Sequence, residues 1–185
     1  MQTQTNRART RRLYMFMFMV GLLASVAATP DRDARAAGAA PDSDLGADEP
    51  ALIDGAETVW ITQSGTAESA SVDQQGTDNL ISLTQTVANN TAAISQAGSH
   101  NAITLAQSGS GNQASIAQSG MYNTLSTSQM GIGNALDVVQ AGTGNSATIQ
   151  QQGSGDTVQL HQSGSHLSIA IEQNGSGMHA VVAQH

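Results

Sequence analysis

Polar and apolar residues alternate along most of this chain, with a period of two inside a longer unit of eleven residues. In the stretch NAITLAQ, from Asn101 to Gln107, the asparagine, isoleucine, leucine and glutamine fall on one side of an extended chain and the remaining residues on the other. The next four residues, SGSG, supply two glycines that tolerate tight bends. The pattern predicts a strand of about seven residues followed by a turn of about four.

The eleven-residue unit repeats in register without insertion or deletion and reads Q-x-G-x-x-N-x-Φ-x-Φ-x, where Φ is apolar or small. Its glutamines are Gln63, Gln74, Gln85, Gln96, Gln107, Gln118, Gln129, Gln140, Gln151, Gln162, Gln173 and Gln184. Its asparagines are Asn79, Asn90, Asn101, Asn112, Asn123, Asn134 and Asn145, and the outer units carry Glu68, Asp156, Leu167 and Met178 instead. Its glycines, expected at the bends, are Gly65, Gly76, Gly98, Gly109, Gly120, Gly131, Gly142, Gly153, Gly164 and Gly175, with Val87 in place of glycine in one unit. Such repetition predicts a solenoid.

The predicted fold class is all-β: an amyloid-like β-solenoid of two facing parallel sheets, in which two strand-bend units form one coil of 22 residues. A single sheet would leave its apolar face uncovered, and no helical pattern is present to cover it. The first Φ position supports this fold, because large and small side chains alternate from Val59 to Leu125. Such alternation is expected if odd and even units lie in different sheets, although it fails at Leu136, Ala147 and Val158.

The inward-facing glutamines and asparagines predict ladders of side-chain amides. A buried amide costs about 1 to 3 kcal/mol when it lacks a hydrogen-bond partner. In a stack of coils, each amide donates to its copy on one side and accepts from its copy on the other, as in steric zippers. Charged side chains cannot stack in this way, which explains why the units carry so little charge. A solvated polar tract, the alternative, does not account for twelve units in register.

The chain is acidic, and its basic residues are confined to its beginning. Its formal net charge is -8, it has no cysteine, and all six Lys and Arg residues are arginines at or before Arg35. Beyond residue 50 no basic side chain is available to neutralise phosphates, so we expect no nucleic acid partner. The missing cysteine excludes a disulfide framework and a thiolate metal site.

The first part of the chain is expected to direct export. Four arginines precede the apolar run LYMFMFMVGLLASVAA, from Leu13 to Ala28, and small residues end it. This arrangement predicts a signal peptide over residues 1–28. A transmembrane anchor is the alternative, but the run is shorter than the roughly 20 residues that a span needs. Residues 29–51 are expected to form a disordered leader, and residues 52–185 the solenoid.

The pattern offers no catalytic constellation. The candidates for chemistry are His100, His161, His166, His179 and His185. His100 and His166 occupy the same bend position but would lie three coils apart, about 14 Å, which is too far to share a metal ion. No carboxylate recurs with His161 and His166. We therefore expect no enzyme, no catalytic or metal-binding residues, no cofactor and no small-molecule substrate.

A soluble adhesive or ice-binding solenoid is a distant alternative. Ice binding needs a flat array of outward threonines, whereas the outward seventh and ninth positions mix Ser, Thr, Ala, Leu, Gln, Asp and Val. Calcium-binding nonapeptide solenoids need G-G-x-G-x-D, which the sequence lacks. Trp60 is interpreted as a surface or edge aromatic, with ligand stacking as the alternative.

The two ends of the predicted solenoid are its expected contact surfaces. Soluble solenoids carry polar caps or a covering helix, and the sequence shows neither. The last unit ends in pattern at VVAQH. Many inward side chains are small, so the isolated solenoid is expected to be marginally stable. End-to-end stacking would extend the backbone pairing and the ladders, which predicts an open, head-to-tail filament.

The repeats resemble the curlin repeat, S-x5-Q-x-G-x2-N-x-A-x3-Q. The segment SIAQSGMYNTLSTSQ, from Ser115 to Gln129, carries this pattern, and the resemblance extends over roughly residues 52 to 185. Curlins are the subunits of curli, the extracellular amyloid of bacterial biofilms. The resemblance implies a secreted, cell-surface fibre that serves matrix formation and adhesion. It also implies self-association, contacts with other curlin subunits, and export through an outer-membrane pore with its accessory proteins, with the leader as secretion address.

Curli contain a major subunit and a minor subunit that nucleates fibre growth at the cell surface. The divergent outer units, with Leu167 and Met178, resemble the nucleator, whereas the lack of basic residues there favours the fibre-forming subunit. We favour the fibre-forming role and keep the nucleator as the alternative. Five acids are candidate gatekeepers that slow assembly, or they serve solubility alone: Asp73, Asp78, Asp137, Asp156 and Glu172.

Overall fold

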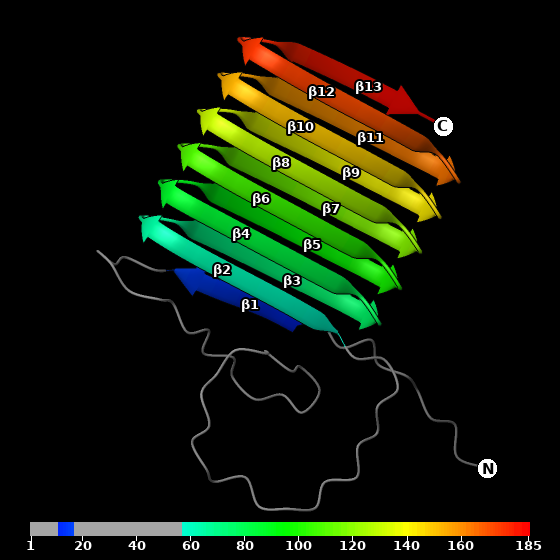
Figure 1. Ribbon diagram of the computed structural model, residues 1–185. Coiled ribbons are helices and arrows are strands. Elements are labelled where there is room, and N and C mark those ends of the chain that lie inside the picture. Colours follow the sequence, from blue (N-terminus) through cyan, green and yellow to red (C-terminus); the bar gives the residue numbers. More distant parts are fainter. Residues whose placement is uncertain (1–10, 17–56) are drawn as a thin grey trace, which may run out of the picture.

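The computed structural model describes residues 11–16 and 57–185, which form strands joined by short bends (Figure 1). The strands are β1 (Arg11–Phe16), β2 (Thr58–Thr66), β3 (Ser69–Thr77), β4 (Leu80–Ala88), β5 (Thr91–Ser99), β6 (Ala102–Ser110), β7 (Gln113–Met121), β8 (Thr124–Ile132), β9 (Ala135–Thr143), β10 (Ser146–Ser154), β11 (Thr157–Ser165), β12 (Ser168–Ser176) and β13 (His179–Gln184). Residues 11–16 and 57–185 contain no helix long and apolar enough to cross a membrane.

From β2 onward, consecutive strands alternate between two sheets that face each other (Figure 1). One sheet has the order β1-β3-β5-β7-β9-β11-β13, and the other has the order β12-β10-β8-β6-β4-β2. All pairs except β1–β3 are parallel. Each residue pairs with its equivalent one coil later, as Leu105 does with Thr127. The predicted β-solenoid of two facing parallel sheets, with coils of 22 residues, is confirmed.

The strands are longer and the bends tighter than the repeat pattern suggested. Strands β2 to β12 each span 9 residues. The reason is that the repeat glycine stays within the strand: Gly109 pairs with Val87 on one side and with Gly131 on the other. The chain reverses two residues after the glycine, where Asp78 and His100 adopt left-handed φ values of 55° and 57°.

The core lies between the sheets and consists of the Φ positions. Burial alternates along each strand. Outward residues such as Trp60, which is 50% exposed, face solvent, and the inward residues pack against one another between the sheets. The irregularity in the alternation of large and small side chains has a simple cause. Up to Leu125 in β8, the large residues of the first Φ position lie in the sheet of β8 and β10. After it, the large Leu136 and Val158 lie in the facing sheet, on β9 and β11, and the small Ala147 lies on β10.

Strand β1 runs antiparallel to β3 and occupies the edge of its sheet (Figure 1). The register places Arg11 opposite Gln74 and Phe16 opposite Ser69. In the full chain, β1 thus covers one edge of the solenoid, whereas the two uncovered ends were expected of residues 52–185 without the predicted signal peptide. The other residues of the predicted signal peptide, and the predicted leader over residues 29–51, lie outside the described residues.

Candidate functional site

The inward glutamines form two continuous ladders of side-chain amides, one in each sheet. In every link, Nε2 of one glutamine donates to Oε1 of the glutamine 22 residues later, at distances from 2.6 to 3.0 Å. One ladder runs through Gln63, Gln85, Gln107, Gln129, Gln151 and Gln173, and the other through Gln74, Gln96, Gln118, Gln140, Gln162 and Gln184. Because all links have the same direction, each ladder has an acceptor end and a donor end.

The glutamine amides also tie the two sheets together. Gln107 Nε2 donates to Thr91 O at 3.1 Å, and Gln129 Nε2 donates to Gln113 O at 3.0 Å. Each of these carbonyl groups belongs to the facing sheet. A ladder glutamine thus uses both amide hydrogens, one along the stack and one across it, which satisfies a polar group that is almost completely buried.

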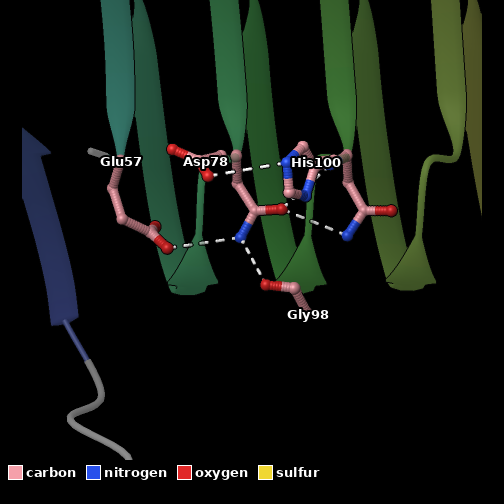
Figure 2. Close-up of polar contacts among 6 residues, drawn as sticks. Glu57, Asp78, Gly98 and His100 are labelled. Carbon is pink, nitrogen blue, oxygen red and sulfur yellow. Dashed lines mark hydrogen bonds and ion pairs between the residues drawn. The ribbon is translucent and has the colours of Figure 1, made fainter. Parts of the chain in front are cut away.

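The asparagines lie at the bends and bond largely to the backbone, which departs from the predicted ladder of amides alone. Asn79 Nδ2 donates to Gly98 O at 2.9 Å (Figure 2). It also donates to Gln75 O at 3.1 Å. Asn79 Oδ1 accepts from the backbone N of Asn101 at 3.0 Å and from its Nδ2 at 3.1 Å. A bend leaves backbone groups without strand partners, and the short asparagine side chain reaches them.

Two carboxylates take the first position of the two asparagine columns. Glu57 Oε1 accepts from Asn79 Nδ2 at 3.2 Å (Figure 2). Glu68 accepts from the backbone N of Asn90 at 3.0 Å and from its Nδ2 at 3.3 Å. Burial raises the pKa of Glu68 above its usual 4.5, and the hydrogen bonds from Asn90 act in the opposite direction. In the sequence, Glu68 stood out only as a departure from asparagine, and the structure shows that both acids serve as acceptors.

Asp156 replaces asparagine inside one column and leaves a polar atom without a partner. Its Oδ1 accepts from the backbone N of Met178 at 2.9 Å. Its Oδ2 is buried and has no hydrogen-bond partner. Asp156 Oδ2 occupies the same place beside Gly153 that Asn79 Nδ2 occupies beside Gly76. A Cβ added to these glycines would lie 3.0 Å from Asp156 Oδ2 and 3.1 Å from Asn79 Nδ2. Asp156 Oδ2 therefore takes the place of an amide donor, although it cannot donate when ionised.

Glycine is needed at the third position because successive coils approach closely there. A Cβ added at Gly98 would lie 1.9 Å from Gly120 O, and one at Gly109 would lie 2.1 Å from Gly131 O. Val87 is the exception: it adopts a φ of 94°, which is strained for a β-branched residue, and its side chain is 57% exposed.

The two ends of the glutamine ladders carry opposite hydrogen-bonding groups. At the N-terminal end, Gln63 Oε1 and Gln74 Oε1 are buried and accept no hydrogen bond. At the C-terminal end of the described coils, the two ladders end at Gln173 and Gln184. Acceptors therefore remain at one end of the solenoid and donors at the other.

The asparagine columns end in apolar residues. The backbone N of Leu167 donates to Asn145 Oδ1 at 3.0 Å, and that of Met178 donates to Asp156 Oδ1. The side chains of Leu167 and Met178 offer no acceptor to a further coil, and Met178 is 39% exposed. The ladder is thus interrupted at these two positions.

Some titratable side chains meet outside the core. His100 Nε2 lies 3.5 Å from Asp78 Oδ2 (Figure 2), and the His100 ring stacks on Tyr122 with 4.8 Å between centroids. The rings of His161 and His185 lie 5.9 Å apart. In the part of the chain that the structure describes, no group of three or more His, Cys, Asp or Glu side chains is arranged to hold a metal ion.

These features define a class of protein: a β-solenoid whose strand-bend-strand coils are joined by repeated amide hydrogen bonds. A sequence profile of the curlin associated repeat matches residues 58–86 and 101–131. These two stretches are thus curlin associated repeats, which confirms the resemblance to the curlin family drawn from the repeats. The curlin family and this fold are structural rather than enzymatic. No curated protein matches the chain.

Proposed function

We propose that the chain is the fibre-forming subunit of an extracellular, curli-like functional amyloid that grows by head-to-tail stacking of solenoid ends. Its family implies self-association into a fibre at the cell surface. Roles in the biofilm matrix and in surface adhesion are part of the proposal. So are export through an outer-membrane pore with accessory proteins and contact with other curlin subunits.

The complementarity of the ladder ends supports this proposal most directly. Because the repeat has no insertions, a second molecule that follows the last coil continues both sheets in register, with its β2 beside β12 and its β3 beside β13. The Gln63 of that molecule then follows Gln173, and its Gln74 follows Gln184. In the two glutamine ladders, each buried oxygen that lacks a donor would then meet an amide that can donate to it.

Strand β1 must leave before the N-terminal end can take part in this junction. It occupies the edge of β3 to which β13 of another molecule would pair. If residues 1–28 are removed as a signal peptide, β1 is removed with them, and the edge becomes free. Cleavage on export would then couple secretion to assembly.

The nucleating subunit remains the second candidate, because Leu167 and Met178 interrupt the asparagine columns at the C-terminal end. A nucleator needs only one end that templates growth. Traces of this protein added to another curlin of the same source separate the roles. Strong seeding, together with fibres that detach from cells when this chain is deleted, would favour the nucleator. Loss of all fibre mass on deletion would favour the main subunit.

Incubation of the exported form at micromolar concentration tests the fibre itself. We expect fibres that bind Congo red and give a meridional reflection near 4.8 Å. Gln173→Leu should slow elongation, because it removes a donor from the junction. Asn174→Leu, one residue further and exposed, is the matched control and should elongate normally. A persistent monodisperse monomer under these conditions would refute the proposal.

A further inference from the structure

Trp60 lies at the N-terminal edge of the solenoid, on the strand that a stacked molecule would meet. It is the only tryptophan of the chain and belongs to β2, which lies at the opposite end of its sheet from β12 (Figure 1). Its side chain points outward and is 50% exposed. The sequence predicted a surface or edge aromatic, and the structure places this residue on an edge strand.

Trp60 begins a row of outward side chains that are otherwise small. The row occupies the ninth position of the repeat unit, and the parallel register orders it from β2 to β12 as Trp60, Ser82, Thr104, Ser126, Thr148 and Ala170. The row thus starts with its largest residue and ends with its smallest. In the proposed stack, the next molecule's Trp60 would follow Ala170, just as Ser82 follows Trp60 within one molecule.

The corresponding row of the facing sheet has the opposite order of sizes. From β3 to β13 it reads Ser71, Ala93, Ser115, Asp137, Gln159 and Val181. Val181 is 76% exposed, which makes it the most exposed large apolar side chain of the described residues. The next molecule's Ser71 would follow Val181. On both outer faces of the junction, a large apolar side chain would therefore meet a small one.

Exposed apolar residues that are scattered singly over a surface need no explanation by themselves. Met130 and Val139 are such residues, and both lie on strands with neighbours on two sides. Trp60 and Val181 differ because each lies on a terminal strand, where one side has no neighbour in the described chain. Equivalent side chains on adjacent strands are about 4.8 Å apart, so an indole reaches a side chain on the next strand.

We propose that two apolar contacts hold the outer faces of the junction between stacked molecules: Trp60 packs over Ala170 of the preceding copy, and Val181 of that copy packs beside Ser71. This inference rests on the proposed function, because it concerns the same head-to-tail junction. A second copy of this chain is thus the partner of Trp60. The indole is the principal anchor, because it is the larger apolar group and its partner offers a methyl group without a polar atom.

The two contacts differ in what the full chain leaves accessible. Strand β1 pairs with β3 and places Tyr14 opposite Ser71, so the Val181 contact requires that β1 leave. No described strand lies beyond β2 in the other sheet, so the edge that carries Trp60 is already open. On β12, Ser168 and Glu172 flank Ala170 as outward neighbours and supply a polar rim around the anchor.

The critical concentration for seeded elongation of the exported form tests the anchor. Trp60→Ser should raise it on the order of five- to thirty-fold, as expected when about 40 to 80 Å² of apolar surface is no longer removed from water. The matched control is Met130→Ser, which also removes a side chain that is 50% exposed in the same sheet. The control should stay within about two-fold of the parent, because Met130 lies in an interior coil.

Val181→Ser tests the facing sheet and should raise the critical concentration about two- to five-fold, since less apolar surface is at stake. Its control is Val139→Ser, which changes an outward valine on the interior strand β9 and should elongate as the parent does. All four serine variants should keep the parent's urea midpoint as unassembled chains. A Trp60→Phe variant keeps an apolar ring and should elongate nearly as the parent does; it decides the matter if Trp60→Ser does not form strands by circular dichroism.

The emission of the parent reports on the contact directly, because Trp60 is the only tryptophan. On assembly, the emission should move to shorter wavelengths, and acrylamide should quench it less than in the unassembled chain. Fibres in which acrylamide reaches Trp60 as freely as before, or Trp60→Ser fibres with the parent's critical concentration, would overturn the contact and leave the proposed function intact. Absence of fibres from the parent would overturn both.

Discussion

Gln107 Nε2 donates to Gln129 Oε1 at 2.8 Å across one coil of the solenoid, and each side chain is only 1% exposed. Gln107→Leu would remove this donor and would also take the Oε1 that accepts from Gln85. We expect the free energy of unfolding to fall by about 2 to 6 kcal/mol, because two buried polar groups lose partners at about 1 to 3 kcal/mol each.

Urea unfolding of the unassembled chain measures this loss. Thr104→Leu is the matched control, since Thr104 lies on the same strand and points to solvent. Its effect should stay within about 0.5 kcal/mol. Equal effects of the two substitutions would contradict the ladder as a source of stability.

Val87→Gly should stabilise the chain by about 1 kcal/mol, because it relieves the φ of 94° that a β-branched residue adopts at this position. The reverse change at the equivalent position of the next coil, Gly109→Val, should be strongly destabilising, since a Cβ there meets Gly131 O. Thermal unfolding of both variants provides the measurement. A lower melting temperature for Val87→Gly would show that the strain is absent.

Asp156→Asn should raise the free energy of unfolding by about 1 to 3 kcal/mol. The introduced side chain would restore the amide donor that every interior asparagine supplies, where Asp156 Oδ2 now has no hydrogen-bond partner. The comparison is Asp137→Asn, which neutralises an outward-facing acid and should have little effect. If both changes raise stability equally, the gain comes from net charge and not from the hydrogen bond.

Removal of residues 1–28 should accelerate fibre growth, because it takes β1 away from the edge of β3. The control is removal of residues 1–10, which leaves β1 in place. Seeded elongation at equal protein concentration compares the two truncated chains with the full chain. Equal rates for all three would mean that β1 does not protect the edge.

Glu68 should make the stability of the unassembled chain depend on pH. Its pKa is raised in the folded state by burial, so the fold favours the protonated form more than the unfolded chain does. The stability that Glu68 contributes is therefore complete below its ordinary pKa near 4.5 and is lost as the pH rises through the higher folded value. Glu68→Gln should lose less stability than the parent between about pH 4 and pH 7. Glu172→Gln, at an exposed position, should follow the parent.

Much of the fold could be predicted because the repeat pattern determines how the strands face and pair. Alternation of polar and apolar residues fixes which side chains share a face, and glutamines spaced by eleven fix the register. Ile103 and Leu105 were therefore expected inside, and both are buried. The bends were less predictable: the glycines looked like turn residues, yet Gly109 remains paired within its strand because its φ of 107° keeps the chain extended enough to bond.

The sequence by itself determined the coil length, the inward row and the continuity of the glutamine stack, because these follow from periodicity along one extended chain. Only the tertiary structure decided that Asn79 bonds the backbone of Gly98, that Glu57 and Glu68 accept from asparagines, and that β1 covers β3. The physical reason is that these contacts depend on where separate coils lie relative to one another. A side chain's partner at a bend is chosen by distance and direction in space, which a linear pattern does not contain.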